Sequence, residues 1–256
     1  MNDLHTRFPD YSVFKFTQLN STNQFLKQFA KSLANDITKP AVCIALQQLA
    51  GYGQRQSRWL SNQQSITFSI LYKIKFPIHQ LYGFSQSVAL SIRNELSNLD
   101  PDHQFYVKWP NDIYLDGSKL AGILIESVRC DYDSCWLVIG VGVNFGDFRY
   151  SFKDYTARGL RVKQGRDFVL VKLIQTLDEF LNDFTDVYWQ DHYSSWQMND
   201  LVSLDQEIIM KASGRVTTGY YAGLDKSGSL LIKPSSNSVD CQTFPSGSIS
   251  IRLTNE

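Results

Sequence analysis

The sequence predicts an α+β protein, in which a mixed and mostly antiparallel sheet with helices is followed by a small all-β domain. Segments with strand-like and helix-like apolar spacing are mixed through the first two hundred residues. From about Leu201 the pattern changes to short strands separated by Gly and Ser turns. We therefore expect a large domain at residues 1–199 and a small one at residues 200–256.

The first half of the chain contains predicted strands at residues 11–19, 41–46 and 65–72. Ser21-Thr22-Asn23 precedes apolar residues that fall on one helical face, so we expect a helix to begin there. Ser21 followed by Gln24 is typical of a capping box. A second amphipathic helix is predicted from residue 81 to residue 99, before Asp100-Pro101.

The second half begins with predicted strands at 104–109, 113–115, 119–129 and 135–145. Asp116-Gly117 predicts a tight hairpin, because both residues tolerate positive φ. Residues 146–165 are polar and irregular, and we expect a functional loop there. One helix is predicted at residues 168–188, and a second helix is predicted to end near Met198. The final strands are predicted at 207–211, 216–222, 230–232 and 249–253, in a unit small enough to need docking on the large domain.

Composition argues against several classes of function, although a local basic patch that binds nucleic acid remains possible. Lys plus Arg equals Asp plus Glu, at 25 each, so no global field draws the chain to DNA or to an anionic membrane. No apolar run is long enough to span a bilayer, and the first residues do not resemble a signal peptide. We expect a cytoplasmic protein. Cys130 and Cys135 lack the two-residue gap of a zinc or redox motif, so we expect free thiols.

The stretch Lys108-Trp109-Pro110-Asn111-Asp112 is the strongest candidate for chemistry. The four histidines are isolated, and no Walker-type phosphate loop is present. Pro110 fixes how the chain leaves the preceding strand, and the hairpin then aims Lys119 from the neighbouring strand. Two lysines, an amide and a carboxylate would gather at one sheet edge. Local chemistry alone also allows a β-turn with solvated charges.

Three motifs resemble the biotin–protein ligases in sequence and in order: KWPND at 108–112, KLAGILIE at 119–126 and IGVGVNF at 139–145. The resemblance extends to Ser21-Thr22-Asn23, to Gly51-Tyr52-Gly53 with Trp59, and to the C-terminal segments 223–232 and 244–252. It implies a catalytic domain with a class II synthetase-like fold and a C-terminal SH3-like barrel. It also implies two steps: ATP, with Mg²⁺, activates biotin as biotinyl-AMP, and a lysine of a biotin carboxyl carrier domain then takes the biotin.

The resemblance also assigns residues to roles. Lys119 would bridge biotin's carboxylate and the α-phosphate, where a compact cation stabilises developing charge. Asp112 would accept the incoming lysine's proton, or else pair with Lys119 or Lys108. Biotin-binding residues would be Ser21, Thr22, Asn23, Gln48, Gly51, Tyr52, Gly53, Gln54, Lys119 and Gly122. ATP-binding residues would be Arg55, Trp59, Asn111, Gly142, Asn144 and Arg252. Capping by Ser21 and a plain core role for Trp59 remain open, and the Mg²⁺ ligands stay unidentified.

The loop at residues 51–59 departs from the family pattern. Tyr52, Gln54 and Ser57 replace three patterned arginines, and Gln56 replaces a glycine. We therefore expect weaker retention of the adenylate, unless Arg55 or Arg58 substitutes. Ser248 also stands where the family often has an acid.

The partner implied is the biotin carboxyl carrier domain of acetyl-CoA carboxylase. About ten residues precede the first strand, so we expect no winged-helix domain and no direct DNA binding. The sequence is compatible with either a monomer or a homodimer. Three alternatives remain: a lipoate or octanoate ligase, a non-catalytic biotin sensor, and a pure interaction module.

Overall fold

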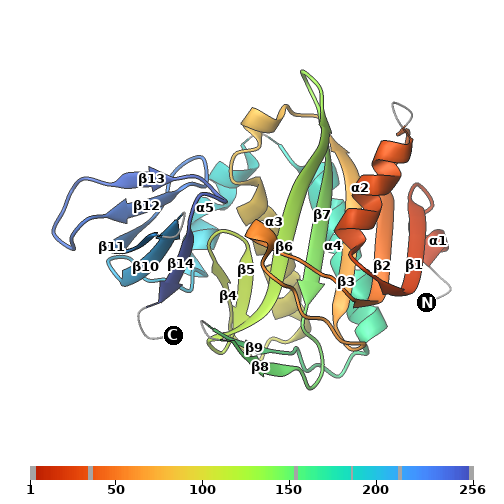
Figure 1. The fold of residues 1–256 in the computed structure, drawn as a ribbon, viewed down its shortest axis with the longest axis horizontal. Helices are drawn as coiled ribbons and strands as arrows, with labels where there is room; N and C mark the ends of the chain where they lie inside the picture. Colours follow the sequence, from red (N-terminus) through yellow and green to blue (C-terminus); the bar gives the residue numbers. More distant parts are fainter. Residues whose placement is uncertain (1–3, 34–36, 153–154, 186, 213–214, 254–256) are drawn as a thin grey trace.

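The computed structural model describes residues 4–33, 37–152, 155–185, 187–212 and 215–253, which form two sheets (Figure 1). The larger sheet has the strand order β1-β2-β3-β7-β6-β5-β4, with β8 and β9 beside β6. Its strands are β1 Ser12–Leu19, β2 Ala41–Gln48, β3 Ile66–Ile74, β4 Phe105–Lys108, β5 Asp112–Leu115, β6 Ser118–Cys130, β7 Cys135–Val143, β8 Arg149–Ser151 and β9 Thr156–Arg158. Pairing is antiparallel except for β1 with β2 and β6 with β9. The predicted mixed, mostly antiparallel sheet is confirmed.

Helices cover both faces of this sheet (Figure 1). The helices of the described residues are α1 Leu4–Arg7, α2 Thr22–Ser32, α3 Phe84–Leu99, α4 Arg166–Asp183 and α5 Tyr188–Met198. On one face α2 packs Leu26 and Ala30 against Cys43, Leu71 and Val138. On the opposite face α3 and α4 bury their apolar stripes in the main core. None of the helices in the described part of the chain is long and apolar enough to cross a membrane.

Side chains shrink along β7 on the face that α2 covers. Trp136 and Val138 pack beneath α2, while the next residues on that face are Gly140 and Gly142. A Cβ at Gly140 would overlap the side-chain oxygen of Asn23, and one at Gly142 would lie 2.6 Å from the ring of Trp59. The two glycines therefore let the side chains of Asn23 and Trp59 lie directly against the sheet, just beyond the beginning of α2.

The β5–β6 hairpin forms at the predicted turn and contains a bulge. Asp116 and Gly117 have φ values of 46° and 71°, which confirms the turn prediction. Lys119 and Gly122 are three residues apart, so a regular strand would turn them to opposite faces. The register shifts between Ile113 and Tyr114, and the additional residue on β6 brings Lys119 to the same face as Gly122.

The smaller sheet has the order β13-β12-β11-β10-β14 and agrees with the predicted SH3-like unit. Its strands are β10 Glu207–Ala212, β11 Arg215–Leu224, β12 Leu230–Lys233, β13 Gln242–Phe244 and β14 Ser250–Leu253. It docks through the turn before β12: the Gly228 carbonyl accepts hydrogen bonds from Trp109 Nε1 at 3.1 Å and from Gln86 Nε2 at 3.2 Å. The boundary at residue 200 stays a prediction.

Some expected elements differ from the structure. The helix predicted for residues 168–188 ends at Asp183, and Phe184 is extended with φ −63° and ψ 128°. The Phe184 ring packs edge-on against Phe84, with centroids 4.9 Å apart, and helical periodicity does not reveal this tertiary contact. The residues at 146–165 include the short strands β8 and β9, and β13 and α1 were not predicted.

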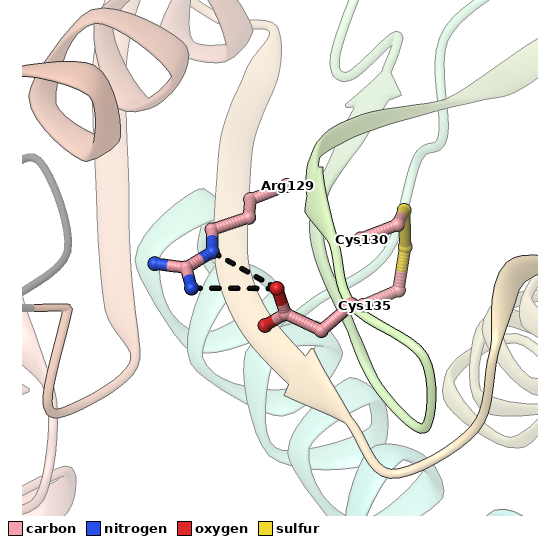
Figure 2. Close-up of a disulfide and its surroundings, with 4 residues drawn as sticks. Arg129, Cys130 and Cys135 are labelled. Carbon is pink, nitrogen blue, oxygen red and sulfur yellow. Dashed lines mark hydrogen bonds and ion pairs between the residues drawn. A yellow bond between two sulfur atoms is a disulfide. The ribbon is translucent and has the colours of Figure 1, made fainter.

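The prediction that Cys130 and Cys135 are free thiols was wrong, because the structure joins them in a disulfide (Figure 2). They face each other at the ends of β6 and β7, where a hairpin turn brings them together. The sequence test considered only two-residue gaps and not cross-strand neighbours. In the described residues Cys43 is buried and Cys241 exposed, and neither is in a disulfide.

Candidate active site

A cavity of about 360 Å³ opens on the α2 face of the larger sheet, above the glycines of β7. Strands β5, β6 and β7, the beginning of α2, residues 52–59 and β14 of the smaller sheet all contribute to its wall. Its volume is within the usual range for small-molecule sites. The arrangement places one end beside α2 and the other end beside the smaller sheet.

The α2 end of the cavity is polar and closely hydrogen-bonded. Ser21 caps α2 by accepting from the Gln24 amide at 3.3 Å, as the capping prediction requires. The Thr22 amide and hydroxyl both donate to Gln48 Oε1, at 2.8 and 3.1 Å. Ser69 on β3 lies beneath them, with its hydroxyl 2.7 Å from that of Thr22. Capping and ligand binding are therefore compatible at Ser21–Asn23.

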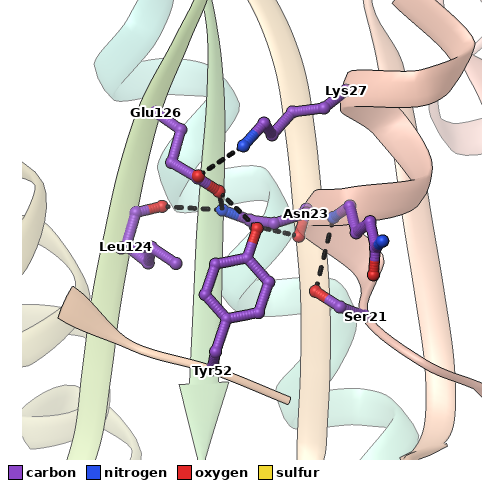
Figure 3. Close-up of polar contacts among 8 residues, drawn as sticks. Ser21, Asn23, Lys27, Tyr52, Leu124 and Glu126 are labelled. Carbon is purple, nitrogen blue, oxygen red and sulfur yellow. Dashed lines mark hydrogen bonds and ion pairs between the residues drawn. The ribbon is translucent and has the colours of Figure 1, made fainter. Parts of the chain in front are cut away.

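Glu126 holds three side chains around this polar end (Figure 3). It accepts from Asn23 Nδ2 at 3.0 Å and from the Tyr52 hydroxyl at 2.8 Å, and pairs with Lys27 Nζ at 2.6 Å. Asn23 also donates to the Leu124 carbonyl at 3.3 Å. Both amide hydrogens of Asn23 are thus used within the protein, which fixes the direction of its carbonyl oxygen.

The Glu126 network affects two ionisable groups. Burial raises the pKa of Tyr52, and the hydrogen bond to Glu126 raises it further, so Tyr52 stays a hydroxyl donor. Burial alone would raise the pKa of Glu126. The hydrogen bonds from Lys27, Asn23 and Tyr52 outweigh burial and hold the pKa of Glu126 below its ordinary value.

Lys119 and Asp112 form an ion pair in the middle of the cavity, with Nζ 2.7 Å from Oδ1. Their side chains are 17% and 24% exposed, so both remain accessible from the cavity. The Lys119 Nζ also lies 5.5 Å from the centre of the Tyr155 ring. Tyr155 comes from the 146–165 region, where a functional loop was expected.

The other members of the KWPND segment line the same wall. Lys108 is buried, with its Nζ 3.3 Å from the Tyr114 hydroxyl. Asn111 is tied to β6, since its side chain donates to the Ile123 carbonyl and its own carbonyl accepts from the Ile123 amide at 3.0 Å. The structure therefore gathers two lysines, an amide and a carboxylate at one place, as the sequence predicted.

The side chains of Trp59 and Asn144 each have one buried polar atom without a hydrogen-bond partner in the described part of the chain. Trp59 lies over Gly142 and Gly122, and its buried Nε1 has no hydrogen-bond partner among the described residues. The same holds for Asn144 Oδ1, whereas Asn144 Nδ2 donates to the Lys119 carbonyl at 3.3 Å. Trp59 belongs to the cavity wall, whereas Asn144 does not, and the buried Trp59 Nε1 lies against Gly142 of the sheet.

A model of the Biotin/lipoate A/B protein ligase family matches residues 13–144, which is more than half of the chain. The chain belongs to this family. The family prediction is confirmed, and with it the expectation that the protein is a ligase. The matched residues include α2 and strands β1 to β7, and so most of the cavity wall.

Similar proteins support this ligase assignment. The bifunctional ligase/repressor BirA of Salmonella typhimurium is 27% identical over 90% of this chain and 72% of its own length. The biotin--[acetyl-CoA-carboxylase] ligase of Paracoccus denitrificans is 25% identical over 80% of this chain and 88% of its own. The biotin protein ligase of Aquifex aeolicus, solved in complex with biotin and ATP, has the same fold, with a TM-score of 0.73, 22% identity, and coverage of 95% and 99%.

Most site residues predicted for the ligase line one cavity. They are Ser21, Thr22, Asn23, Gln48, Tyr52, Gly53, Gln54, Arg55, Trp59, Asn111, Asp112, Lys119, Gly122, Gly142 and Arg252. Gly51 and Asn144 lie behind this wall rather than in it. Gly51 packs against Trp59, and a Cβ there would lie 3.0 Å from the Trp59 carbonyl oxygen. The individual roles of all these residues stay predictions.

Sequence reasoning missed Ser69, Tyr155 and the part played by Glu126. Ser69 lies among apolar residues in a predicted strand, and nothing in that segment indicates that its side chain contacts the polar end of the cavity. Tyr155 belongs to the polar, irregular segment at residues 146–165, where a functional loop was expected but no residue was named. Glu126 closes the KLAGILIE motif, and its position on the same strand face as Leu124 and Gly122 was the available indication.

Replacing Glu126 by Gln is expected to weaken biotin binding about fivefold to tenfold, because Lys27 loses its partner and Asn23 is less firmly held. Calorimetric titration of biotin measures this.

The lowered pKa means that Glu126 stabilises the fold above its ordinary pKa of about 4.3, and that this stability is lost as pH falls through the lower folded value. The melting temperature of Glu126→Gln should therefore fall less than that of the wild type below pH 4. Glu179→Gln, at an exposed position of α4, is the control; equal acid sensitivity of all three proteins contradicts the prediction.

Proposed function

We propose that this ligase activates biotin with ATP to form biotinyl-AMP and then transfers the biotin to a lysine of a carrier domain. The observation that carries the proposal is the continuity of one cavity. It joins the polar end at Thr22 and Asn23, the Lys119–Asp112 pair and the side chain of Trp59. A carboxylic acid and a nucleotide bound at the two ends would meet at Lys119.

The first step makes the carboxylate reactive. A carboxylate oxygen attacks the α-phosphorus of ATP, and pyrophosphate leaves. Negative charge spreads over the α-phosphoryl oxygens, and the Lys119 ammonium stabilises it because it is a compact cation held in a partly water-free site. Its present partner, Asp112, keeps Lys119 within the cavity and prevents it from turning to solvent.

The second step needs a neutral amine. A free lysine has a pKa near 10.4, so only about one in two or three thousand is neutral at pH 7. We propose that Asp112 accepts the proton of the carrier lysine once Lys119 contacts the phosphate, which combines both alternatives for Asp112. The amine then attacks the acyl carbon, and AMP leaves with the electron pair of the broken anhydride bond.

Mg²⁺ enters this scheme as part of the substrate MgATP. In the described ranges no group of three or more His, Cys, Asp or Glu side chains is placed to hold a metal ion. Mg²⁺ usually binds nucleotides through the phosphates, water and one or two protein oxygens.

The relative from Paracoccus denitrificans is named as a ligase for acetyl-CoA carboxylase. We therefore propose that the partner here is the biotin carboxyl carrier domain of that enzyme. We propose that the reaction takes place in the cytoplasm, where ATP and the carrier are available.

The test is to incubate the wild-type protein with biotin, MgATP and a biotin carboxyl carrier domain, followed by mass spectrometry of the carrier. A gain of one biotinyl group is expected, and no gain with lipoate or octanoate on a lipoyl domain. Transfer of lipoate instead would make it a lipoate-type ligase. Biotin binding without ATP–pyrophosphate exchange would make it a sensor, and both results overturn the proposal.

A further inference from the structure

The segment from Gly51 to Trp59, which we call the cavity loop, is anchored at its base to the larger sheet. The Trp59 amide donates to the Gly51 carbonyl at 2.9 Å, and the Gly53 amide donates to the Ser57 carbonyl at 2.7 Å. Tyr52 reaches down to Glu126 on β6, at 2.8 Å. These contacts fix where the loop begins and ends, beside the cavity.

The tip of the cavity loop reaches the smaller sheet instead. Arg55 Nε donates to the Gly247 carbonyl at 3.2 Å, and Arg55 Nη2 donates to the Ile249 carbonyl. Both acceptors are backbone oxygens on either side of Ser248, just before β14. A single side chain thus joins the loop to a segment about 190 residues further along the chain.

The backbone at the tip is held in an unusual conformation. Arg55 has φ 54° and Gln56 has φ 59°, so two consecutive residues with side chains lie in the left-handed region. Residues other than glycine rarely adopt this conformation, and it persists where the surrounding contacts fix it. The hydrogen bonds of Arg55 to the smaller sheet supply such contacts.

The loop and the smaller sheet lie on the same cavity. Gln54, Arg55, Ser250 and Arg252 all belong to its wall. A contact between the loop tip and the beginning of β14 therefore closes the wall between the cavity loop and the smaller sheet. If this contact opens, the cavity opens between the two parts of the protein.

We propose that Arg55 is a positioning residue that latches the cavity loop to the smaller sheet and thereby slows loss of the acyl-adenylate. It does so through backbone carbonyls rather than through an acidic side chain. The Ser248 hydroxyl is turned to the Pro245 carbonyl, at 2.6 Å. The latch keeps the acyl-adenylate in the cavity in place of the missing loop arginines, and this part of the inference rests on the proposed function.

The loop itself is tested without any substrate, by amide hydrogen exchange of the peptide that contains residues 53–59. Arg55→Gln is expected to exchange about tenfold faster than the wild type, because two hydrogen bonds from a partly exposed cation are lost. Arg58→Gln removes the same charge from the same loop, and its exchange should stay within about twofold of the wild type. Unchanged exchange in Arg55→Gln, or equal acceleration in both variants, overturns the latch.

The nature of the acceptors gives a second test. Because the acceptors are neutral carbonyl oxygens, ionic strength should affect the latch little. The amide hydrogen exchange rate of the wild type should therefore change little between low salt and about 1 M salt. Ser248→Asp places a carboxylate beside the guanidinium, and exchange should become slower at low salt and return to the wild-type rate at high salt. A strong salt dependence in the wild type would show that Arg55 instead pairs with a carboxylate.

Retention is measured as the rate at which preformed biotinyl-adenylate leaves each protein. Arg55→Gln should release it about tenfold faster than the wild type, with an unchanged melting temperature. Faster exchange without faster release would limit Arg55 to a structural role and overturn the retention part. If the wild type forms no adenylate, the proposed function fails, while the exchange experiment still decides the latch.

Discussion

Replacing Lys119 by Met is expected to lower the rate of adenylate formation about 10²- to 10³-fold, the usual loss when one group that stabilises transition-state charge is removed. Methionine keeps a flexible chain of similar length without the charge. Lys119 lies in the middle of the cavity at 2.7 Å from Asp112, so the substitution leaves the core packing intact. ATP–pyrophosphate exchange dependent on biotin measures the first step directly.

Three controls separate this role from a structural one. The melting temperature of Lys119→Met should stay within a few degrees of the wild type, since Lys119 and Asp112 line a cavity from which water can reach Asp112 when its partner is removed. Lys119→Arg keeps the charge but changes its geometry, and should recover part of the rate. Asp112→Asn should slow transfer to the carrier more than adenylation. If Lys119→Met catalyses ATP–pyrophosphate exchange at a rate near that of the wild type, Lys119 does not stabilise the transition state of adenylation.

The fold was largely predictable because its elements carry local patterns. The Asp116-Gly117 turn, the capping Ser21 and the apolar face of α2 each have a short-range cause, and all three appear where expected. The end of α4 was not predictable in this way. Phe184 leaves the helix at a place where its ring packs against α3, and only the tertiary structure determines this.

The site was predictable from its motifs, but its internal contacts were not. KWPND and KLAGIL located Lys119 and Asp112, yet the bulge that turns Lys119 to the cavity face has no marker in the sequence. The altered cavity loop suggested a weaker hold on the adenylate. The structure shows contacts that depend on distant segments instead, from Tyr52 to Glu126 and from Arg55 to the carbonyls beside Ser248.

Replacing Gly142 by Ala is expected to lower the affinity for ATP about tenfold to a hundredfold, while biotin binding changes much less. A Cβ at Gly142 would lie 2.6 Å from two atoms of the Trp59 ring, closer than atoms approach in folded proteins. Trp59 must then move off the sheet, and overpacking of this kind costs about 1–3 kcal/mol. The indole nitrogen leaves the end of the cavity that the nucleotide is proposed to occupy.

Gly140 provides the matched control, two residues earlier on the same face of β7. A Cβ there would overlap the Asn23 oxygen, so Gly140→Ala should weaken biotin binding and leave ATP binding nearly unchanged. Separate calorimetric titrations of biotin and of ATP with both variants measure the two ends of the cavity independently. Since both substitutions add one methyl group to the same strand, a general loss of stability would affect both ligands in both proteins. Only the crossed pattern, with each variant impaired for a different ligand, supports biotin beside α2 and the nucleotide beside Trp59.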